Sequence, residues 1–230
     1  MLNILVLDPY PKASHRICKD NAGAYGTANH YGDTLFCKLL SLLVRYSDKS
    51  PPLFAAQIIG ELESSGHQVE YSQQMKDKNY DLYIIITSIV CHETEIEVIK
   101  KLKYQNKNII AAGPFASSVP ENYIKAGAKV ILGEPDMFFH KFNLDKEDIT
   151  NLPEKIKNFA IYDIDEMSLP GWKTILKKVN TTMKFLGSGK SLYIQSSRGC
   201  PYPCFYYCTY PTQQGRKLRF KNVSKILEEM

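Results

Sequence analysis

The amino-acid sequence predicts an α/β fold in which five parallel strands form a doubly wound sheet. Short aliphatic runs alternate along the chain with segments of helical periodicity, as in repeated strand and helix units. The runs are apolar at successive positions, as expected of parallel strands that are covered on both faces. Small or polar residues follow most of them. Ligands of this fold class bind beyond those carboxyl ends of the strands.

The first predicted strand covers residues 2–7, an aliphatic run that ends in Asp8-Pro9. Residues 10–33 are rich in glycine, asparagine and tyrosine, and they are too many for a simple connection. Loops of this length are usually functional or disordered. A helix is predicted over residues 34–46, where leucines recur at helical spacing.

A second helix is predicted after Pro51-Pro52, because apolar residues then recur every four positions until Gly66 ends the pattern. Residues 68–72 form a short predicted strand. The run at residues 82–87 is apolar and largely β-branched, so we expect it to be a central strand.

Charge predicts the next helix, over residues 93–103. Glutamates crowd its start and lysines its end, which is the arrangement that the helix dipole favours. Residues 108–112 are another buried strand, residues 121–125 a short helix, and residues 129–132 the fifth strand.

The predicted ligand-binding edge consists of the residues that follow the strands. The candidates are Asp8, Thr87, Ser88, Gly113, Pro114, Gly133 and Glu134. The architecture alone allows a flavin, a nucleotide or a corrin. Neither G-x-G-x-x-G nor a phosphate-binding loop follows the first strand.

We expect residues 1–142 to form the sheet domain, residues 143–185 a linker and residues 186–230 the start of a second domain. Residues 1–170 carry 18 Lys/Arg and 22 Asp/Glu, a net charge of −4, whereas residues 171–230 carry 11 and 2, a net charge of +9. The basic part suits an anionic cofactor or docking onto the acidic first domain. Nucleic-acid binding is the less favoured interpretation.

Three of the six cysteines, Cys200, Cys204 and Cys208, fall within nine residues. Pro201 and Pro203 disfavour a helix in this segment. We therefore predict a loop that presents three thiols. A zinc site would lack a fourth ligand, because no C-x2-C pair and no histidine beyond position 140 is available. A 4Fe-4S cluster normally takes four cysteines, so three leave one iron with an open position. Zinc, an inactive remnant and structural thiols remain alternatives.

The segment Arg198-Gly199-Cys200-Pro201-Tyr202-Pro203-Cys204, with an aromatic residue directly before Cys208, resembles the cluster loop of radical S-adenosylmethionine enzymes that carry an N-terminal cobalamin-binding domain. The likeness extends to a strand ending in Asp-Pro, a helix begun by Pro-Pro, a Gly-Pro-Phe turn, a Gly-Glu-Pro-Asp turn and a later Leu-Pro-Gly-Trp. It implies a flavodoxin-like cobalamin domain, a linker, and the first βα unit of a partial (β/α) barrel. That unit would consist of a strand at residues 191–195, an extended segment at 217–220 and a helix from 222.

The resemblance also implies roles for individual residues. Cys200, Cys204 and Cys208 would hold a 4Fe-4S cluster that chelates S-adenosylmethionine, Tyr207 would lie against the adenine, and Arg198 and Gly199 would shape the loop. An electron donor such as flavodoxin or ferredoxin would serve the cluster, and the family's radical chemistry often transfers a methyl group. The alternative is a cobalamin-binding module without catalysis of its own.

Two departures from related patterns bear on these expectations. D-x-H-x-x-G, which supplies a cobalt ligand in other cobalamin proteins, is absent because Tyr10 stands two residues after Asp8. We therefore expect no histidine from this loop on cobalt, with His15 and His30 as weaker candidates. The sequence ends within a predicted helix at Met230, which we interpret as a fragment, a truncated product, or one half of a split enzyme completed by a second chain.

The N-terminal aliphatic run lacks a preceding basic region and ends too early for a signal peptide or a membrane span. The remaining thiols, Cys18, Cys37 and Cys91, are scattered and form no disulfide framework. We therefore expect a cytoplasmic protein.

The cysteine spacing generates a prediction, because the family has C-x3-C-x2-C and this chain has C-x3-C-x3-C. One extra residue adds about 3.3 Å of chain and turns the next side chain over, so the loop must absorb it as a bulge. We expect a variant lacking Tyr206 to retain iron and sulfide against a chelator better than the unaltered protein. Equal or poorer retention would show that the longer spacing is native to the loop.

Overall fold

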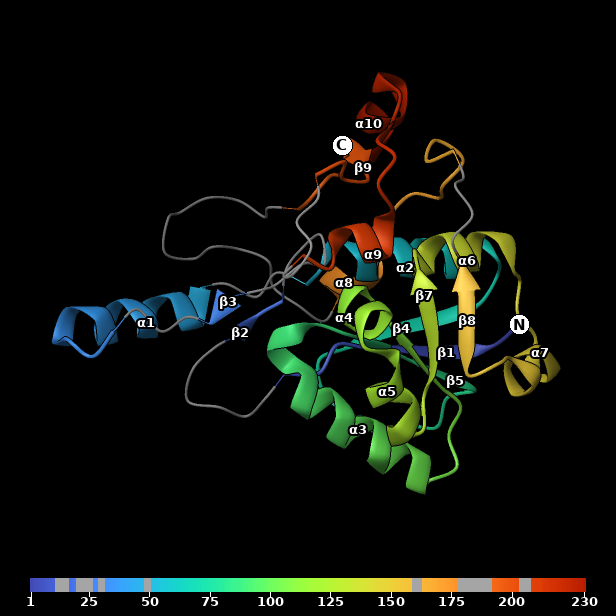
Figure 1. Ribbon diagram of the computed structural model, residues 1–230, viewed down its shortest axis with the longest axis horizontal. Coiled ribbons are helices and arrows are strands. Elements are labelled where there is room, and N and C mark those ends of the chain that lie inside the picture. Colours follow the sequence, from blue (N-terminus) through green and yellow to red (C-terminus); the bar gives the residue numbers. More distant parts are fainter. Residues whose placement is uncertain are drawn as a thin grey trace.

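The structure, a computed structural model, describes residues 1–10, 17–19, 27–28, 32–47, 51–158, 163–177, 192–202 and 208–230. Its centre is a parallel sheet of six strands in the order β4-β1-β5-β6-β7-β8 (Figure 1). The strands are β1 (Asn3–Leu7), β4 (Gln68–Ser72), β5 (Leu82–Ile86), β6 (Ile109–Ala112), β7 (Lys129–Gly133) and β8 (Lys155–Asn158). This is the flavodoxin-like order with one strand added at the far edge. The predicted α/β fold is confirmed, and the predicted number of five strands is corrected to six.

The sixth strand, β8, falls within residues 143–185, which the sequence predicts as a linker. It pairs in parallel with β7. Its side chains alternate, since Ile156 and Asn158 are buried and the two lysines are exposed. Such alternation of buried and exposed residues is typical of an edge strand with one face in water. The strands were predicted from continuous apolar runs, so this strand was missed. The predicted domain boundaries stay predictions.

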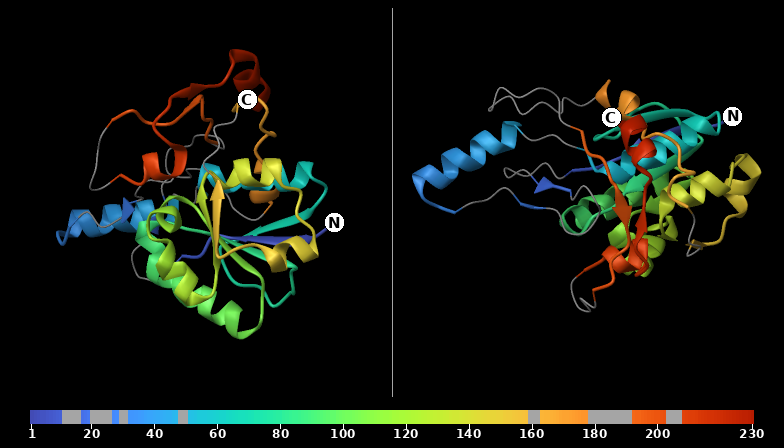
Figure 2. Two further views of the ribbon diagram at one scale, coloured as in Figure 1. Left: turned by 45° about the vertical axis from the view of Figure 1, so that its right-hand side comes forward. Right: turned by 90° about the horizontal axis from the view of Figure 1, so that it is seen from above.

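Helices cover both faces of the sheet (Figures 1 and 2). One face packs against α2 (Leu53–Ser64), α6 (Pro135–Lys141), α7 (Lys146–Asn151) and α8 (Trp172–Leu176), and the other against α3 (His92–Tyr104) and α5 (Pro120–Ala126). Neighbouring residues of β5 show the division, because Ile84 belongs to the first core and Ile85 to the second. Every residue of β5 and β6 is buried, so the predicted central position of β5 is confirmed.

The charge pattern that predicts a helix near residues 93–103 is confirmed in α3. Two glutamates lie in its first turn and two lysines in its last. Glu95 is nevertheless fully buried. It stands on the same face as Ile99 and Leu102, which belong to the core. A carboxylate in this position needs a partner inside the protein.

Helix α1 (Leu35–Ser47) projects from the body of the molecule, to the left in Figure 1, and confirms the helix predicted there. Its apolar side chains Leu35, Phe36 and Leu39 are more than half exposed. Within the described part of the chain, no helix is long and apolar enough to cross a membrane.

Short antiparallel pairs occur in two places outside the sheet. In the predicted loop before α1, β2 (Ile17–Cys18) pairs with β3 (Thr27–Ala28). Near the C-terminus, β9 (Ser197–Arg198) pairs with β10 (Arg219–Phe220), with α9 (Tyr210–Gln214) between them and α10 (Val223–Glu229) after them. The strand predicted at residues 191–195 is wrong for residues 192–195, which belong to no strand, and a strand of two residues begins instead at Ser197. The described residues contain no parallel barrel unit, and the barrel stays a prediction.

Gly60 brings α2 into direct contact with the segment that leads into α8. A Cβ at Gly60 would lie 2.1 Å from the backbone oxygen of Leu169, and a Cβ at Gly171 would lie 2.3 Å from Cγ2 of Ile59. The amide of Gly171 also donates to Ala56 O over 2.7 Å. The two segments therefore touch backbone to backbone.

We expect Gly60→Ala to lower the free energy of unfolding by about 1–3 kcal/mol, because the added methyl group forces these segments apart. The better helix propensity of alanine, worth about 1 kcal/mol, opposes the loss without cancelling it. Urea unfolding measures the change. Lys100→Ala, at an exposed position of α3, is the control and should change stability by less than about 0.5 kcal/mol. A Gly60→Ala protein as stable as the control would contradict the close contact.

Candidate functional site

The carboxyl edge of the sheet brings together the residues that the sequence predicts to contact a ligand. Asp8 follows β1, Thr87 and Ser88 follow β5, Gly113 and Pro114 follow β6, and Gly133 and Glu134 stand at the end of β7. The polar residues among them are at most 5% exposed as whole residues. Buried polar groups require hydrogen-bond partners, and those partners determine what the edge can still bind.

The carboxylate of Asp8 is paired with a lysine from the long loop after β1. Lys19 Nζ lies 3.0 Å from Asp8 Oδ1 and 2.9 Å from Glu95 Oε1, and it donates to Ile86 O over 2.6 Å. None of the three charged side chains has exposed surface. We refer to Asp8, Lys19 and Glu95 as the buried triad. It lies where β1 and β5 end, which is the topological switch point at which ligands of this fold class bind.

Two tyrosines and a backbone amide donate further hydrogen bonds to the carboxylates of the buried triad, whereas among the described residues Asp8 Oδ1 has only its ion pair with Lys19. Tyr71 OH donates to Asp8 Oδ2 and Tyr123 OH to Glu95 Oε2, each over 2.7 Å, and Ser88 N donates to Glu95 Oε1 over 2.9 Å. Burial raises the pKa of Glu95, while the triad lysine opposes the increase. Burial alone would lower the pKa of that lysine, but the two carboxylates raise it above its ordinary value. The charged side chains of the buried triad therefore occupy the space between the ends of β1 and β5.

The sequence interpretation missed both Lys19 and Glu95. Glu95 had a signal, because it stands four and seven residues before Ile99 and Leu102 on the buried face of α3. Lys19 had no such signal in the sequence, because its loop has no periodicity that would indicate which side chain is buried. Cys91 is also buried near this point, and burial raises its pKa to about 12, so its thiol is unreactive.

The turn after β6 is closed by its own groups. Gly113 has a φ of 134°, and a Cβ there would lie 2.8 Å from Thr87 Oγ1. Thr87 Oγ1 donates to a backbone oxygen of β6 over 3.1 Å and accepts from Ala116 N over 3.2 Å. Pro114 begins α4 (Pro114–Ser118) and is buried. The backbone of this turn therefore lies against the end of β5, and the hydroxyl of Thr87 already has hydrogen-bond partners within the protein.

The cysteine-bearing segment reaches the same edge from the C-terminal part of the chain. Cys200 and Cys208 are free and half-buried, whereas Cys204 and Tyr207 lie outside the described residues. In the ranges that the structure describes, no three His, Cys, Asp or Glu side chains are grouped to hold a metal ion. The three-cysteine site therefore stays a prediction.

Four buried charges join this segment to the end of β7. Arg219 donates through Nη1 to Glu134 Oε2 over 2.9 Å and through Nη2 to Oε1 over 2.5 Å. Arg198 Nη2 donates to Asp136 Oδ2 over 2.5 Å, and Arg198 Nη1 lies 3.7 Å from Glu134 Oε1. We refer to Glu134, Asp136, Arg198 and Arg219 as the four-charge cluster. Burial raises the pKa of Glu134, and the two arginines oppose the increase.

The four-charge cluster contains two residues that the sequence predicts to contact a cofactor, Glu134 and Arg198. Their side chains are at most 7% exposed and are directed to one another and to their neighbours in the cluster. Two carboxylates and two guanidinium groups balance in charge, as burial of ions requires. Direct contact of these residues with a cofactor stays a prediction.

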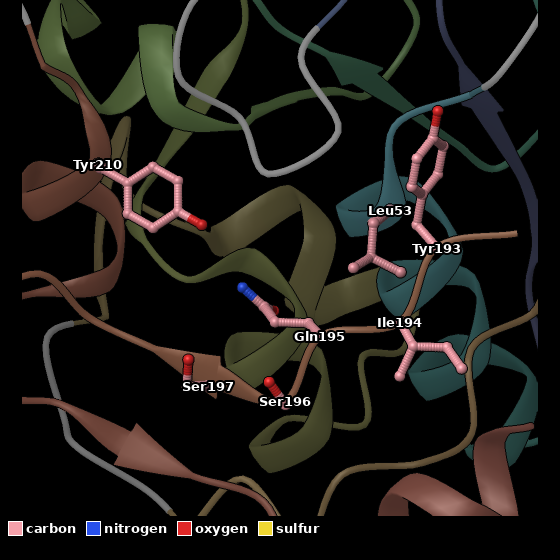
Figure 3. Close-up of a pocket in the computed structure, with 7 residues that line it drawn as sticks. All are labelled: Leu53, Tyr193, Ile194, Gln195, Ser196, Ser197 and Tyr210. Atoms are coloured by element: carbon pink, nitrogen blue, oxygen red, sulfur yellow. The ribbon is translucent and has the colours of Figure 1, made fainter.

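A cavity of about 260 Å³ lies between the start of α2, the segment leading into β9, and the start of α9 (Figure 3). It is lined by Leu53, Tyr193, Ile194, Gln195, Ser196, Ser197 and Tyr210. Tyr210 lies on one side and Leu53 and Tyr193 on the other, with Gln195 between them (Figure 3). Gln195 Oε1 accepts from Arg198 Nε over 3.0 Å, so the cavity adjoins the four-charge cluster.

Comparison with known proteins gives one distant similarity. No protein-family model matches the chain. Over 153 residues the chain is 29% identical to an uncharacterized methyltransferase of Synechocystis sp.. The match takes in 65% of this chain but only 26% of that protein. The chain thus has a methyltransferase-like relative of which it spans a minor part.

We expect Lys19→Met to lower the free energy of unfolding by about 3–5 kcal/mol near neutral pH, because two carboxylates would remain buried without a cation. The loss should be smaller in mild acid. The folded-state pKa of Glu95 is already above its unfolded value and would rise further without Lys19, so protonation below that pKa removes the buried charge. Urea unfolding at about pH 5 and about pH 8 measures both effects.

Lys76→Met is the matched control for this prediction. Lys76 pairs with Glu70 over 2.6 Å, but the two side chains are 25% and 34% exposed. Its removal should cost less than about 1 kcal/mol at either pH. Equal losses in the two variants, or a Lys19→Met deficit that does not change with pH, would contradict the buried triad.

Proposed function

We propose that this chain is part of a methyltransferase that uses S-adenosylmethionine in radical chemistry together with cobalamin. The observation that supports this most is the placement of Cys200, one of the two cysteines of the predicted cluster loop that the structure describes, both of them free. Arg198, two residues before it, is held at the end of β7, and its Nε donates to Gln195, which lines the cavity. The methyltransferase-like relative and the resemblance of the loop agree on the class of reaction.

The residues of this segment fit an iron-sulfur cluster. Thiolates are the usual ligands, and three of them leave one iron open. Cys200 and Cys208 are free, and Cys204 would be the third ligand. The net charge of +9 over residues 171–230 suits an anionic cluster. When bound, the cluster supplies the electron that cleaves S-adenosylmethionine, and a donor such as flavodoxin or ferredoxin replaces that electron.

We assign the cavity beside this segment to the nucleoside part of S-adenosylmethionine. Tyr193 and Tyr210 supply aromatic rings, Ser196 and Ser197 supply hydroxyl groups, and Gln195 supplies an amide. Apolar walls with a few convergent polar groups are typical of cofactor pockets. A cavity of about 260 Å³ has room for a nucleoside but not for a corrin.

Cobalamin would therefore lie outside the carboxyl edge of the sheet. The space between the ends of β1 and β5 is filled by the buried triad, so a ligand group cannot enter there without displacing Lys19. The sequence offers no D-x-H-x-x-G histidine, and His15 and His30 lie outside the described residues. We expect cobalt without a histidine ligand from this loop.

A cobalamin-binding module without its own catalysis is the second candidate. It is favoured by the fact that all six strands of the sheet lie within residues 1–158, before any of the three clustered cysteines. The two candidates differ in iron content, because a module needs no cluster.

We expect anaerobic reconstitution with iron and sulfide to give about four irons per chain in the wild type and less than about half of that in Cys200→Ser or Cys208→Ser. Cys37→Ser, which alters a half-buried thiol on α1, is the control and should retain the wild-type content. Hydroxocobalamin uptake, followed by absorbance, should be unchanged in all three variants.

The outcomes separate the two candidates. Cobalamin uptake without iron would select the module. Iron that persists undiminished in both loop variants would show that the thiols are not its ligands, and a protein that takes up neither cofactor would overturn both candidates.

A further inference from the structure

We propose that the four-charge cluster holds the cysteine-bearing segment at the end of β7, with Glu134 as the positioning residue. The inference rests on the proposed function only in treating the thiols as ligands, and its first test needs no metal. It gives Glu134 and Arg198 a role that does not require contact with a cofactor.

One line of contacts runs from Glu134 to Cys200. Both terminal nitrogens of Arg219 donate to Glu134, and Nη2 also donates to Gln214 O over 2.9 Å. The side chain of Gln214 in turn accepts from Gly199 N over 3.3 Å, directly before Cys200. A forked guanidinium on a carboxylate fixes direction as well as distance. The position of Cys200 is therefore coupled to the end of β7.

A second line reaches the same point through Arg198. Asp136, in the first turn of α6, holds the guanidinium of Arg198 over 2.5 Å. Arg198 stands two residues before Cys200, whose amide donates over 3.1 Å to a backbone oxygen just after α9. Gly199 between them has a φ of 90°, and a Cβ there would lie 2.1 Å from Lys217 O. The backbone at Cys200 is thus enclosed as well as tethered.

The other described cysteine of the loop is attached to the same strand end. Cys208 stands two residues before α9, and α9 packs against α4 and β7. Arg219 donates to the carbonyl oxygen of Gln214, the last residue of α9. Cys208 therefore takes its place both from the packing of α9 on β7 and from the contact of Gln214 with Arg219, which Glu134 binds.

Glu134 is the acid that both arginines share. Its removal would leave two guanidinium groups with Asp136 as their one carboxylate, so the attachment of β9 and β10 to the end of β7 should weaken. The hydrophobic cores contain no residue of β9, β10 or α9. We therefore expect local opening of the cysteine-bearing segment without unfolding of the sheet.

The test uses Glu134→Gln, which keeps the shape of the side chain and removes its charge. In the metal-free protein, reduced and kept under anaerobic conditions, alkylation of Cys200 and Cys208 by iodoacetamide should become at least about fivefold faster, as read by peptide mass spectrometry. Cys91, which is 2% exposed in the core, is the internal reference and should stay unlabelled. Glu121→Gln removes a surface acid that pairs with a lysine and should behave as the wild type.

A second pair of variants keeps the test decisive if Glu134→Gln also exposes Cys91. Arg219→Lys keeps the positive charge and loses the fork, so it should accelerate alkylation of both loop thiols. Glu134→Asp keeps the negative charge and should restore much of the protection that Glu134→Gln loses. If Glu134 only contributed to overall stability, alkylation of Cys200 and Cys208 would rise only together with alkylation of Cys91. Different alkylation rates of the two loop thiols among these variants, with Cys91 unlabelled, therefore indicate positioning.

Iron content separates failure of this inference from failure of the proposed function. Faster alkylation in Glu134→Gln together with iron-free wild-type protein would support the positioning role and count against the cluster. Unchanged alkylation in both Glu134→Gln and Arg219→Lys would overturn the positioning role. If the same two variants also bound as much iron as the wild type, the proposed function would stand without the positioning role of Glu134.

Discussion

Carboxylates buried at the ends of parallel strands are the constraint on which the rest of this structure depends. Asp8 and Glu95 lie where β1 and β5 end, and Glu134 and Asp136 lie just beyond β7, all within the protein interior. A buried charge without a partner is strongly destabilising. The cations come from elsewhere, Lys19 from the long loop after β1 and the arginines from the C-terminal part of the chain. Ion pairs therefore gather segments that are remote in sequence at one edge of the sheet.

The uneven distribution of charge along the sequence has a structural counterpart at this edge. Residues 1–170 carry a net charge of −4 and residues 171–230 a net charge of +9. The pairing of Arg198 and Arg219 with the acids after β7 shows that part of this difference serves docking of the basic segment onto the sheet.

Elements with a local signal could be predicted from the sequence, and pairings between distant residues could not. A continuous apolar run located β5, and charge at both ends located α3. The edge strand β8 was missed because its pattern alternates with water on one face. Glu95 could have been recognised from its place on the buried face of α3, whereas Lys19 stands in a loop without periodicity. That Arg198 would meet Asp136, 62 residues away, depends on the tertiary fold alone.

The backbone contact between α2 and the segment before α8 restricts how this sequence can vary in evolution. The two glycines that form it are limited by different atoms, Gly171 chiefly by the side chain of Ile59 and Gly60 by the carbonyl oxygen of Leu169. A side chain can become smaller by mutation, but a backbone oxygen cannot. A Cβ at position 171 would also lie 2.8 Å from Cβ of Ile59, which every residue except glycine has, so position 171 can change only if position 59 becomes glycine. No single replacement elsewhere makes room at position 60.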